Sequence, residues 1–225
     1  MGRRQRLGRG VRHPGALTLA ILIVAGYLAG SIPSGYWIVR VFKHADIRTM
    51  GSGNIGGTNV WRVYGRWYGL PVVVLDTAKG FAPALVATLV HGHLAGVLAG
   101  GAAMLGHWRP LFMGFQRGGK IVATTGGAFL GVAPIVGGIG AGIWILVFLT
   151  FRYASLASIV GGLSLPPIAV LLGYPWPVIA FACAAAAAIV VLHRSNIRRL
   201  LAGTENRAKL RRATAPAGPT SGRAA

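Results

Sequence analysis

Acidic residues and cysteines are scarce in this sequence of 225 residues. The three acids are Asp46, Asp76 and Glu205, and the single cysteine is Cys183. So few carboxylates cannot form the oxygen-rich cage that Mg²⁺ or Ca²⁺ prefers, and they leave little room for a hydrolase with paired carboxylates. One cysteine excludes an internal disulfide and a multi-cysteine metal site. We therefore expect neither a metal nor another cofactor.

Charged residues of any kind are also few. They make up 12% of the chain, against about 25% in a soluble domain, while 54% of the chain is hydrophobic and the mean hydropathy is +0.61. The charge that is present is nearly all positive, giving a net charge of +20. Lys and Arg stand in short runs between long uncharged stretches, which is typical of membrane loops rather than of a nucleic-acid-binding surface. The composition predicts a membrane protein without a nucleic-acid partner.

The uncharged stretches predict an all-α, polytopic protein with about seven transmembrane helices, because a spanning helix needs about 20 apolar residues. Pro33 and Gly35 are expected to kink the inner end of the first span, while Pro134 and the turn GYPWP at 173–177 divide two longer stretches. The spans are expected near residues 17–39, 70–90 and 94–105, with two helices within 121–151 and two within 153–193.

The positions of Lys and Arg predict the orientation of these spans. With seven spans, the loops 40–69, 106–120 and 152–155 share one side with the C-terminal tail, and they carry many basic residues. The opposite loops, near residues 92, 138 and 175, carry none. The basic side is therefore expected to be cytoplasmic, with the N-terminus outside and the C-terminus in the cytoplasm.

The N-terminal arm contradicts this orientation, because five arginines precede the first span. Either that span is not a simple crossing, or the inner charges outweigh the arm; we favour the second. The chain divides into a basic arm (1–13), a membrane domain (14–205) and a basic tail (206–225) with the composition of a disordered segment.

Four polar clusters lie at the predicted inner side, so they are expected to form a single site. They are GSGNIGGTNVWR (51–62), LDTAKG (75–80), GHWRPLFMGFQRGGKIVAT (106–124) and LHRSNIRRLLAGTE (192–205).

The residue types in these clusters point to a phosphate ligand. Glycines such as Gly53 let backbone N–H groups approach an anion, and Arg62 offers a planar, permanently charged fork. Lys120 follows Gly118 and Gly119 at the expected start of a helix, and all three are expected to bind phosphate, because the free N–H groups and the helix dipole there favour an anion. Hydrogen bonds to oxygen are expected from Ser52, Asn54, Thr58 and Asn59. The spacing of a nucleotide-binding P-loop is absent, so ATP is not implied.

Each cluster also has a structural explanation. The glycines of 51–57 can serve close helix packing, and Arg62, Arg66, Arg109 and Arg117 can be inner-side anchors. Asp76 and Lys79, three residues apart, can simply neutralise each other within the bilayer. His107 and His193 fall at inner ends of spans, where a histidine can be a structural hydrogen-bonding group.

These stretches resemble the bacterial acyl-phosphate:glycerol-3-phosphate acyltransferase family (the PlsY type). The clusters above and the segments GSIPSG (30–35), DIR (46–48), DTAKGFAP (76–83) and RYASLAS (152–158) match the family in order and spacing. The resemblance implies a monomeric seven-helix enzyme of the bacterial plasma membrane with its active site facing the cytoplasm. Its reaction moves a fatty acyl group from acyl phosphate to the 1-hydroxyl of glycerol 3-phosphate, giving lysophosphatidic acid and phosphate for phospholipid synthesis.

The resemblance also assigns roles. It gives Arg62 to glycerol 3-phosphate, matches Lys79 to the second motif as a substrate-binding residue, and leaves Asp76 and His107 as supporting residues. His193 is the candidate base, with a substrate phosphate as the alternative proton acceptor. Phosphate-site ligands are Ser52, Lys120, Ser158 and Asn196.

Two positions depart from the family pattern. Gly57 stands where the family usually has alanine, a mild change, and Ile121 stands where it has glycine. A β-branched residue after Lys120 restricts the backbone and affects where that lysine is placed. Functions of other classes that would use similar residues are a transporter for a phosphorylated solute, which usually shows an internal repeat not seen here, and a lipid-binding scaffold.

Overall fold

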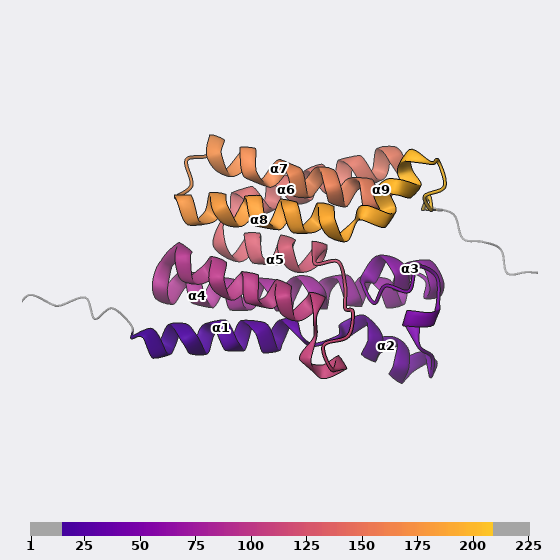
Figure 1. Cartoon of the computed structure of the whole chain (residues 1–225), viewed down its shortest axis with the longest axis horizontal. Coiled ribbons are helices and arrows are strands. Elements are labelled where there is room, and N and C mark those ends of the chain that lie inside the picture. Colours follow the sequence, from indigo (N-terminus) through magenta and orange to yellow (C-terminus); the bar gives the residue numbers. More distant parts are fainter. Residues whose placement is uncertain (1–14, 209–225) are drawn as a thin grey trace, which may run out of the picture.

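The computed structural model describes residues 15–208, and within them every regular element is helical (Figure 1). The predicted N-terminal arm and most of the predicted tail lie outside these residues. Two short 3₁₀ turns, η1 (Ile47–Thr49) and η2 (Leu111–Met113), lie in loops. The helices are α1 (Ala16–Gly30), α2 (Ser34–Lys43), α3 (Gly57–Tyr64), α4 (Arg66–Trp108), α5 (Val122–Val132), α6 (Pro134–Phe151), α7 (Ala154–Leu171), α8 (Trp176–Leu192) and α9 (Arg194–Leu201).

Proline sets three of the helix boundaries, as the sequence predicted. α1 ends at Gly30 and α2 begins after Pro33, so the kink expected there is a complete break. Pro134 opens α6 directly after α5, and Pro175 precedes the first residue of α8. A proline lacks the backbone N–H that would continue a helix, whereas at the first turn that N–H is not needed.

The longest helix, α4, is folded back on itself at Gly92. Gly92 has φ 78° and ψ −173°, a conformation that interrupts the helix and favours glycine. The two halves, 66–91 and 93–108, then run antiparallel: a Cβ on Gly100 would lie 3.3 Å from that of Ala84. The two spans predicted at 70–90 and 94–105 are thus this hairpin, extended by a few residues at the two ends away from Gly92.

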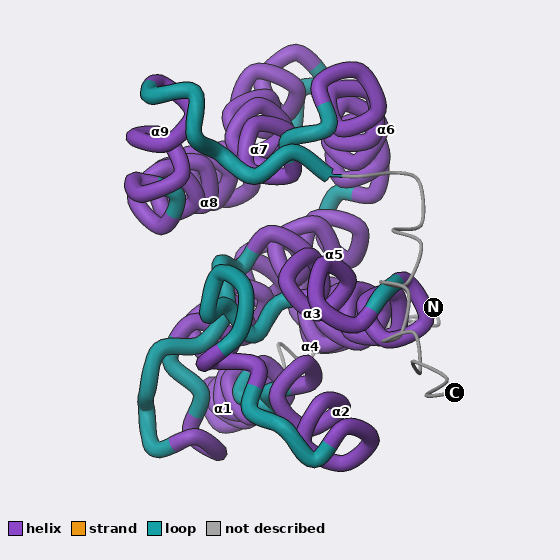
Figure 2. Tube along the Cα trace, turned by 90° about the vertical axis from the view of Figure 1, so that its right-hand side faces the viewer, coloured by secondary structure: helices purple, strands orange, loops and turns teal. Residues whose placement is uncertain are grey.

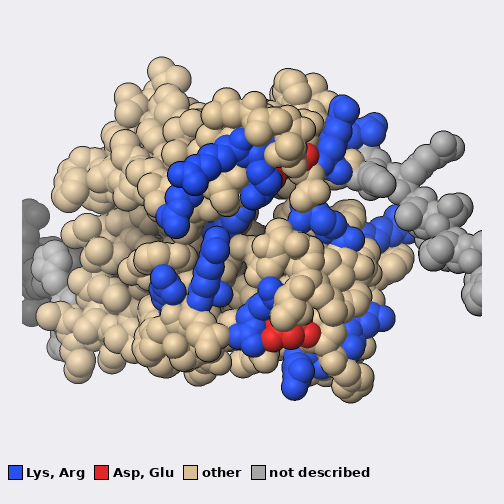
Figure 3. Space-filling model, turned by 45° about the vertical axis from the view of Figure 1, so that its right-hand side comes forward, with Lys and Arg blue, Asp and Glu red and all other residues tan. Residues whose placement is uncertain are grey.

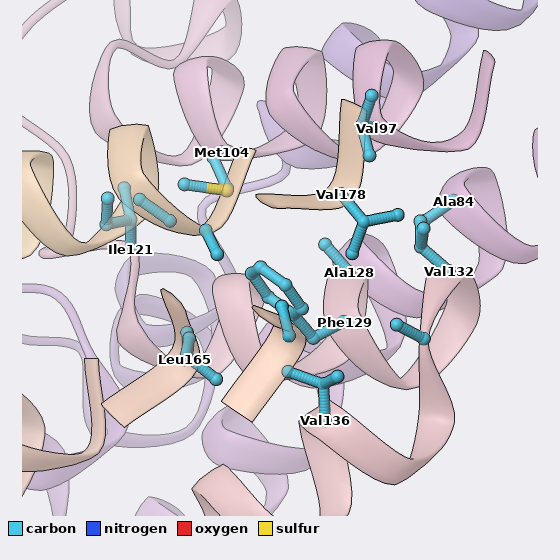
Figure 4. Close-up of a cluster of buried hydrophobic side chains, with 14 of the residues drawn as sticks. Ala84, Val97, Met104, Ile121, Ala128, Phe129, Val132, Val136, Leu165 and Val178 are labelled. Atoms are coloured by element: carbon cyan, nitrogen blue, oxygen red, sulfur yellow. The ribbon is translucent and has the colours of Figure 1, made fainter. Parts of the chain in front are cut away.

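Glycines allow the helices to approach closely. A Cβ on Gly30 of α1 would lie 2.1 Å from the Ala103 carbonyl oxygen, and a Cβ on Gly80 would lie 2.1 Å from that of Thr124 on α5. Small residues at such crossings are typical of membrane helices. The buried core then centres on Phe129, which stacks on Phe181 with ring centroids 5.0 Å apart (Figure 4).

The helices form two groups, α1–α5 and α6–α9 (Figure 2). Within residues 15–208, four helical segments are long and apolar enough to cross a membrane, and the bent pair of α8 and α9 makes up to five. The first of them, 16–43, includes the break at Pro33, and the second, 66–113, includes the turn at Gly92. α5 is apolar but has 11 residues. The multi-pass membrane architecture is therefore confirmed, while the number of seven crossings and the orientation stay predictions.

Candidate active site

A cavity of about 450 Å³ collects the four polar clusters at one end of the helices. It lies among helices α3 to α9 and the segment that follows α9. Eleven of the predicted site residues line this cavity: Ser52, Asn54, Thr58, Asn59, Arg62, Asp76, His107, Lys120, Ser158, His193 and Asn196.

The first cluster forms a loop held by Asn59, whose side chain is 2% exposed. Its Oδ1 accepts a hydrogen bond from the Ser52 N–H (2.9 Å), and its Nδ2 donates to the carbonyls of Met50 (3.0 Å) and Asn54 (2.9 Å). The amide is thereby engaged on both sides, so Asn59 supports the loop instead of offering a hydrogen bond to a ligand. This differs from the role expected for it, because a sequence does not reveal which amide closes a loop.

The glycines of this loop serve different purposes. Gly51 and Gly53 have φ of 57° and 69°, which the turn requires. Gly57 serves close packing, since a Cβ there would lie 2.4 Å from Cγ2 of Val73 on α4. Both the turn and the packing explanation therefore apply within 51–57, and the loop is tightly seated on α4.

Arg62 lies in the last turn of α3 and reaches the cavity from an exposed position. No carboxylate lies within 4.0 Å of its guanidinium among residues 15–208. Its charge is therefore available to an anion in the cavity.

The glycines before Lys120 hold the loop against the end of α4. The N–H of Gly118 donates to the Trp108 carbonyl (2.9 Å) and that of Gly119 to the His107 carbonyl (3.0 Å). A Cβ on Gly119 would lie 1.9 Å from His107 Nε2, so no larger residue fits. The sequence predicted that Gly118 and Gly119 bind phosphate, but their N–H groups are occupied and neither lines the cavity; their observed contacts place Lys120.

Ile121 takes an unusual conformation beside this lysine. It is the N-cap of α5 with φ 60° and ψ −9°, in the left-handed region. A β-branched residue there is an outlier, and the left-handed conformation costs roughly 1–2 kcal/mol. Its side chain is 3% exposed and packs in the core cluster that contains Met104 (Figure 4). The burial of this side chain offsets part of the cost of a position that suits glycine.

Lys120 itself is half-buried and donates a hydrogen bond from Nζ to Oδ1 of Asn196. Burial lowers its pKa to about 8; Glu205 acts in the opposite direction, and Arg199, Arg117 and Arg62 add to the lowering. Lys120 is thus a cation near neutral pH with a neutral amide as its direct partner.

Glu205 holds this region together, although no role was predicted for it. Its Oε1 accepts hydrogen bonds from Ser155 Oγ (2.8 Å) and Asn196 Nδ2 (2.7 Å), and its Oε2 accepts one from Arg199 Nε (2.6 Å). Partial burial acts to raise the pKa of Glu205, but these three hydrogen bonds together lower it. The one available signal was an isolated acid in a very basic segment.

The segment after Glu205 has a defined place as far as Ala208, whose N–H donates to the Arg152 carbonyl (2.8 Å). The rest of the predicted tail, 209–225, lies outside the described residues, so its disorder stays a prediction. Glu205 and Asn206 line the cavity, so this segment forms part of the cavity wall.

His193, between α8 and α9, is 3% exposed and lines the cavity. Its Nδ1 lies 2.8 Å from the Ile189 carbonyl oxygen. A carbonyl only accepts hydrogen bonds, so Nδ1 carries the proton and Nε2 of the neutral ring has a lone pair. Such a ring can accept a proton at Nε2.

Ser158 of α7 is engaged in two hydrogen bonds. Its Oγ donates to the Ala154 carbonyl (2.7 Å) and accepts from Nε1 of Trp144 (3.1 Å). Ser158 therefore lies at the boundary between the polar end of the cavity and its apolar wall.

Lys79 is not brought to this cavity. Its Nζ lies 2.8 Å from Asp76 Oδ1 and donates to the Ile32 carbonyl (2.8 Å). The side chain lines a second cavity of about 550 Å³ between α1, α2 and α4. The structure therefore favours the neutralising pair over the predicted substrate-binding role. Asp76 and His107, with Oδ1 and Nδ1 3.7 Å apart, do lie in the wall of the first cavity.

Lys and Arg side chains gather around a hollow on the face seen in Figure 3. Within residues 15–208, no three His, Cys, Asp or Glu side chains lie close enough together to hold a metal ion. The cavity has cationic groups and amides at its polar end and an apolar wall beyond it, an arrangement that suits an amphiphilic anion.

Comparison with known proteins also indicates a site for a phosphate-bearing substrate. The family model described as glycerol-3-phosphate acyltransferase matches residues 20–203. The chain belongs to this family. It is 44% identical to glycerol-3-phosphate acyltransferase of Desulforudis audaxviator over 86% of this chain and 98% of that protein. It is 43% identical to the enzyme of Rhodospirillum rubrum over 89% and 96%.

Solved structures support the family membership. The chain is similar to PlsY (YgiH), an integral membrane glycerol 3-phosphate acyltransferase, in its glycerol 3-phosphate form, with a TM-score of 0.82 and 42% identity. That match covers 85% of this chain and 96% of the other. A lysophosphatidic acid form matches with a TM-score of 0.78 and 41% identity. The resemblance seen in the sequence is thereby confirmed, and the transporter and scaffold alternatives lose their support.

Proposed function

We propose that this acyltransferase moves a fatty acyl group from acyl phosphate to the 1-hydroxyl of glycerol 3-phosphate, giving lysophosphatidic acid and phosphate. One observation carries the proposal: a single cavity joins a cationic end to an apolar wall. Arg62, Lys120 and Asn196 lie at the cationic end. The apolar wall comes from four helices, with Leu130 of α5, Trp144 and Ile145 of α6, Leu165 of α7 and Ile189 of α8.

The two ends fit the two parts of the reactants. Arg62 and Lys120 are suited to the phosphate groups, since neither cation has a directly bonded carboxylate among residues 15–208. Ser52, Asn54 and Thr58 line the cavity beside Arg62 and are placed to bind glycerol oxygens. The acyl chain lies along the apolar wall. Glycerol 3-phosphate acylation also agrees with the names of the relatives and with the bound forms of PlsY.

The reaction needs no covalent intermediate on the protein. The 1-hydroxyl oxygen attacks the acyl carbon, the bond from that carbon to the phosphate oxygen breaks, and phosphate leaves with the electron pair. The hydroxyl proton goes to His193 Nε2 or to the leaving phosphate. Holding both reactants in place can lower the barrier by about 7–11 kcal/mol in favourable cases. Lys120 and Asn196 stabilise the charge that develops on the phosphate.

We further infer seven crossings, with the N-terminus outside and the active site in the cytoplasm of a bacterial cell. The break at Gly92 makes two antiparallel crossings of α4. α5 runs parallel to the first of them, because Gly127 packs on Thr77 and Gly131 on Phe81 and Leu85. The apolar segments then alternate in direction from α1 to α8. The basic loops share the end that holds the cavity, as the positive-inside rule requires.

The acyl donor is the point to test. Purified protein in detergent or nanodiscs is supplied with glycerol 3-phosphate and either palmitoyl phosphate or palmitoyl-CoA, without added metal. We expect lysophosphatidic acid and phosphate from palmitoyl phosphate, and product formation slower by about 10²–10³-fold in the same mixture with Lys120→Ala. Product from palmitoyl-CoA alone would reject acyl phosphate as the donor.

A further inference from the structure

The DIR segment, 46–48, has no part in the chemistry above, yet it lies between the two loops that form the cationic end. One loop, 44–56, leads into α3 and carries Ser52. The other, 109–120, leads into α5 and ends with Lys120. Each is anchored to its own helix: Asn59 of α3 holds the first, and the Gly118 and Gly119 N–H groups tie the second to α4.

Arg48 joins the two loops, because its guanidinium donates hydrogen bonds to a residue of each. Its Nε and Nη2 donate to the Asp46 carboxylate at 2.9 and 2.6 Å, and its Nη1 donates to Oε1 of Gln116 at 2.7 Å. The guanidinium carbon lies 4.9 Å from the centre of the Tyr36 ring. Asp46 is itself fixed, since Oδ1 also accepts from the Arg48 N–H at 2.9 Å.

The position of this contact matters. Arg48 precedes Ser52 by four residues, and Gln116 precedes Lys120 by four. Within residues 15–208, the contact between Arg48 and Gln116 is the one hydrogen bond that joins 44–56 to 109–120. Met113 adds an apolar contact with the cluster around Ile47. The separation between the two loops therefore depends on one arginine and one packed methionine.

We propose that Arg48 is a positioning residue, which fixes the Ser52 loop and the Lys120 loop at the separation that glycerol 3-phosphate requires. The inference rests on the proposed function. A site already held at its bound geometry does not have to order two loops when the ligand arrives, so it binds more tightly. The role needs arginine, because lysine has no planar fork with which to bond a carboxylate and an amide together.

The test separates KM for glycerol 3-phosphate from kcat. Arg48→Ala and Gln116→Ala are each expected to raise KM about tenfold, with kcat within about twofold of wild type. The two changes break the same contact, so the double variant should match the single ones. Arg48→Lys should behave like Arg48→Ala, whereas Gln116→Glu keeps an acceptor and should keep KM near wild type.

Stability and a control cation distinguish positioning from general damage. The bonded groups are partly exposed, so the thermal midpoint should move by no more than about 3 °C. Arg66→Ala is the matched control, since Arg66 lies over the Trp67 ring next to it and ties no loops together; its KM should stay at wild type. If Arg48→Ala does not fold, Gln116→Ala, on an exposed loop, carries the test.

Two outcomes would overturn the inference. Wild-type KM in Arg48→Ala or Gln116→Ala would show that the contact does not position the loops. A double variant whose KM rises by the product of the single effects would show that the two residues act separately. Failure of the wild-type protein to acylate glycerol 3-phosphate is a different result, which rejects the proposed function and is read in the same assay.

Discussion

Lys79 and Lys120 lie at the walls of two different cavities, and they differ in the charge of the side chain that each contacts directly. Lys79, buried on α4, lies 2.8 Å from Asp76 and donates to the Ile32 carbonyl. Lys120, half-buried before α5, has the neutral side chain of Asn196 as its direct partner. The cavity beside Lys79 is otherwise lined by apolar residues and Ser34, while that of Lys120 also contains Arg62.

The difference shows how one chain uses the same side chain in two ways. A charge within the bilayer is costly, so Lys79 is neutralised where it stands. Lys120 keeps a net positive charge at the polar end of its cavity, where an anionic substrate can supply the missing charge. We therefore assign Lys79 a role in stability and, in the proposed reaction, assign phosphate binding to Lys120.

The largest effect is expected from Lys120→Ala. Removing one charged donor from the developing phosphate should lower kcat/KM by about 10²–10³-fold, in line with the loss of one transition-state donor. The fold should persist, because Lys120 has no carboxylate within 4.0 Å in the described chain. Steady-state kinetics together with a thermal melt checks both parts, and near wild-type kcat/KM would remove Lys120 from the site.

Lys79→Ala should act on stability instead. It leaves the Asp76 carboxylate buried without its partner, which typically costs about 3–5 kcal/mol. The matched variant Asp76→Asn/Lys79→Met has no buried charge and should melt within a few degrees of wild type, with KM for glycerol 3-phosphate unchanged. Thermal melts and KM are measured on both; a raised KM in the folded double variant would give the Asp76–Lys79 pair a role in binding.

The pH dependence of KM reports on Lys120 directly. Its pKa is lowered by burial from 10.5 to about 8, so the free protein carries the cation below about pH 8 and loses it above. KM for glycerol 3-phosphate should therefore rise above pH 8, by at most about tenfold per pH unit. The substrate phosphate titrates near pH 6 and is constant in this range.

Lys120→Arg supplies the control for that profile. Arginine stays protonated throughout, so its KM, although higher overall, should remain flat between pH 7.5 and 9.5. A wild-type KM that does not change over this range, or an arginine variant with the same upward curve, would assign the titration to another group.

The smallest effect is expected at Ile121, which places Lys120. Its φ of 60° suits glycine better than any residue with a Cβ. Ile121→Ala and Ile121→Gly both lose the buried side chain, but only glycine relieves the backbone. The glycine variant should be more stable than the alanine variant by about 1 kcal/mol, or about 2–4 °C in the melt. The reverse order would show that the left-handed backbone is not strained here.

Much of the fold could be predicted from the sequence, because prolines and charges act locally. Pro33, Pro134 and the GYPWP turn end helices where they stand, and basic runs mark the ends of apolar segments. The sequence placed all four polar clusters at the same ends of the predicted spans, so their meeting in one cavity could be predicted. The hairpin within α4 was also expected, although its exact turn at Gly92 depends on one backbone conformation.

The individual roles within the site could not be predicted, since they depend on which partner each polar group finds. Asn59 was expected to bind a ligand, but its amide closes a loop. Lys79 does not reach the first cavity, because its Nζ is held by Asp76 and by the Ile32 carbonyl. Glu205 has no sequence neighbour that reveals its three hydrogen bonds, two of which come from Ser155 and Asn196.

Direct binding of glycerol 3-phosphate is the most decisive measurement. Calorimetry on nanodisc-embedded protein compares wild type, Lys120→Ala and Asp76→Asn/Lys79→Met under one buffer condition. We predict that binding is retained in the Asp76→Asn/Lys79→Met variant and lost in Lys120→Ala. Retained binding in folded Lys120→Ala, with loss in the double variant, would contradict the assignment of phosphate binding to Lys120.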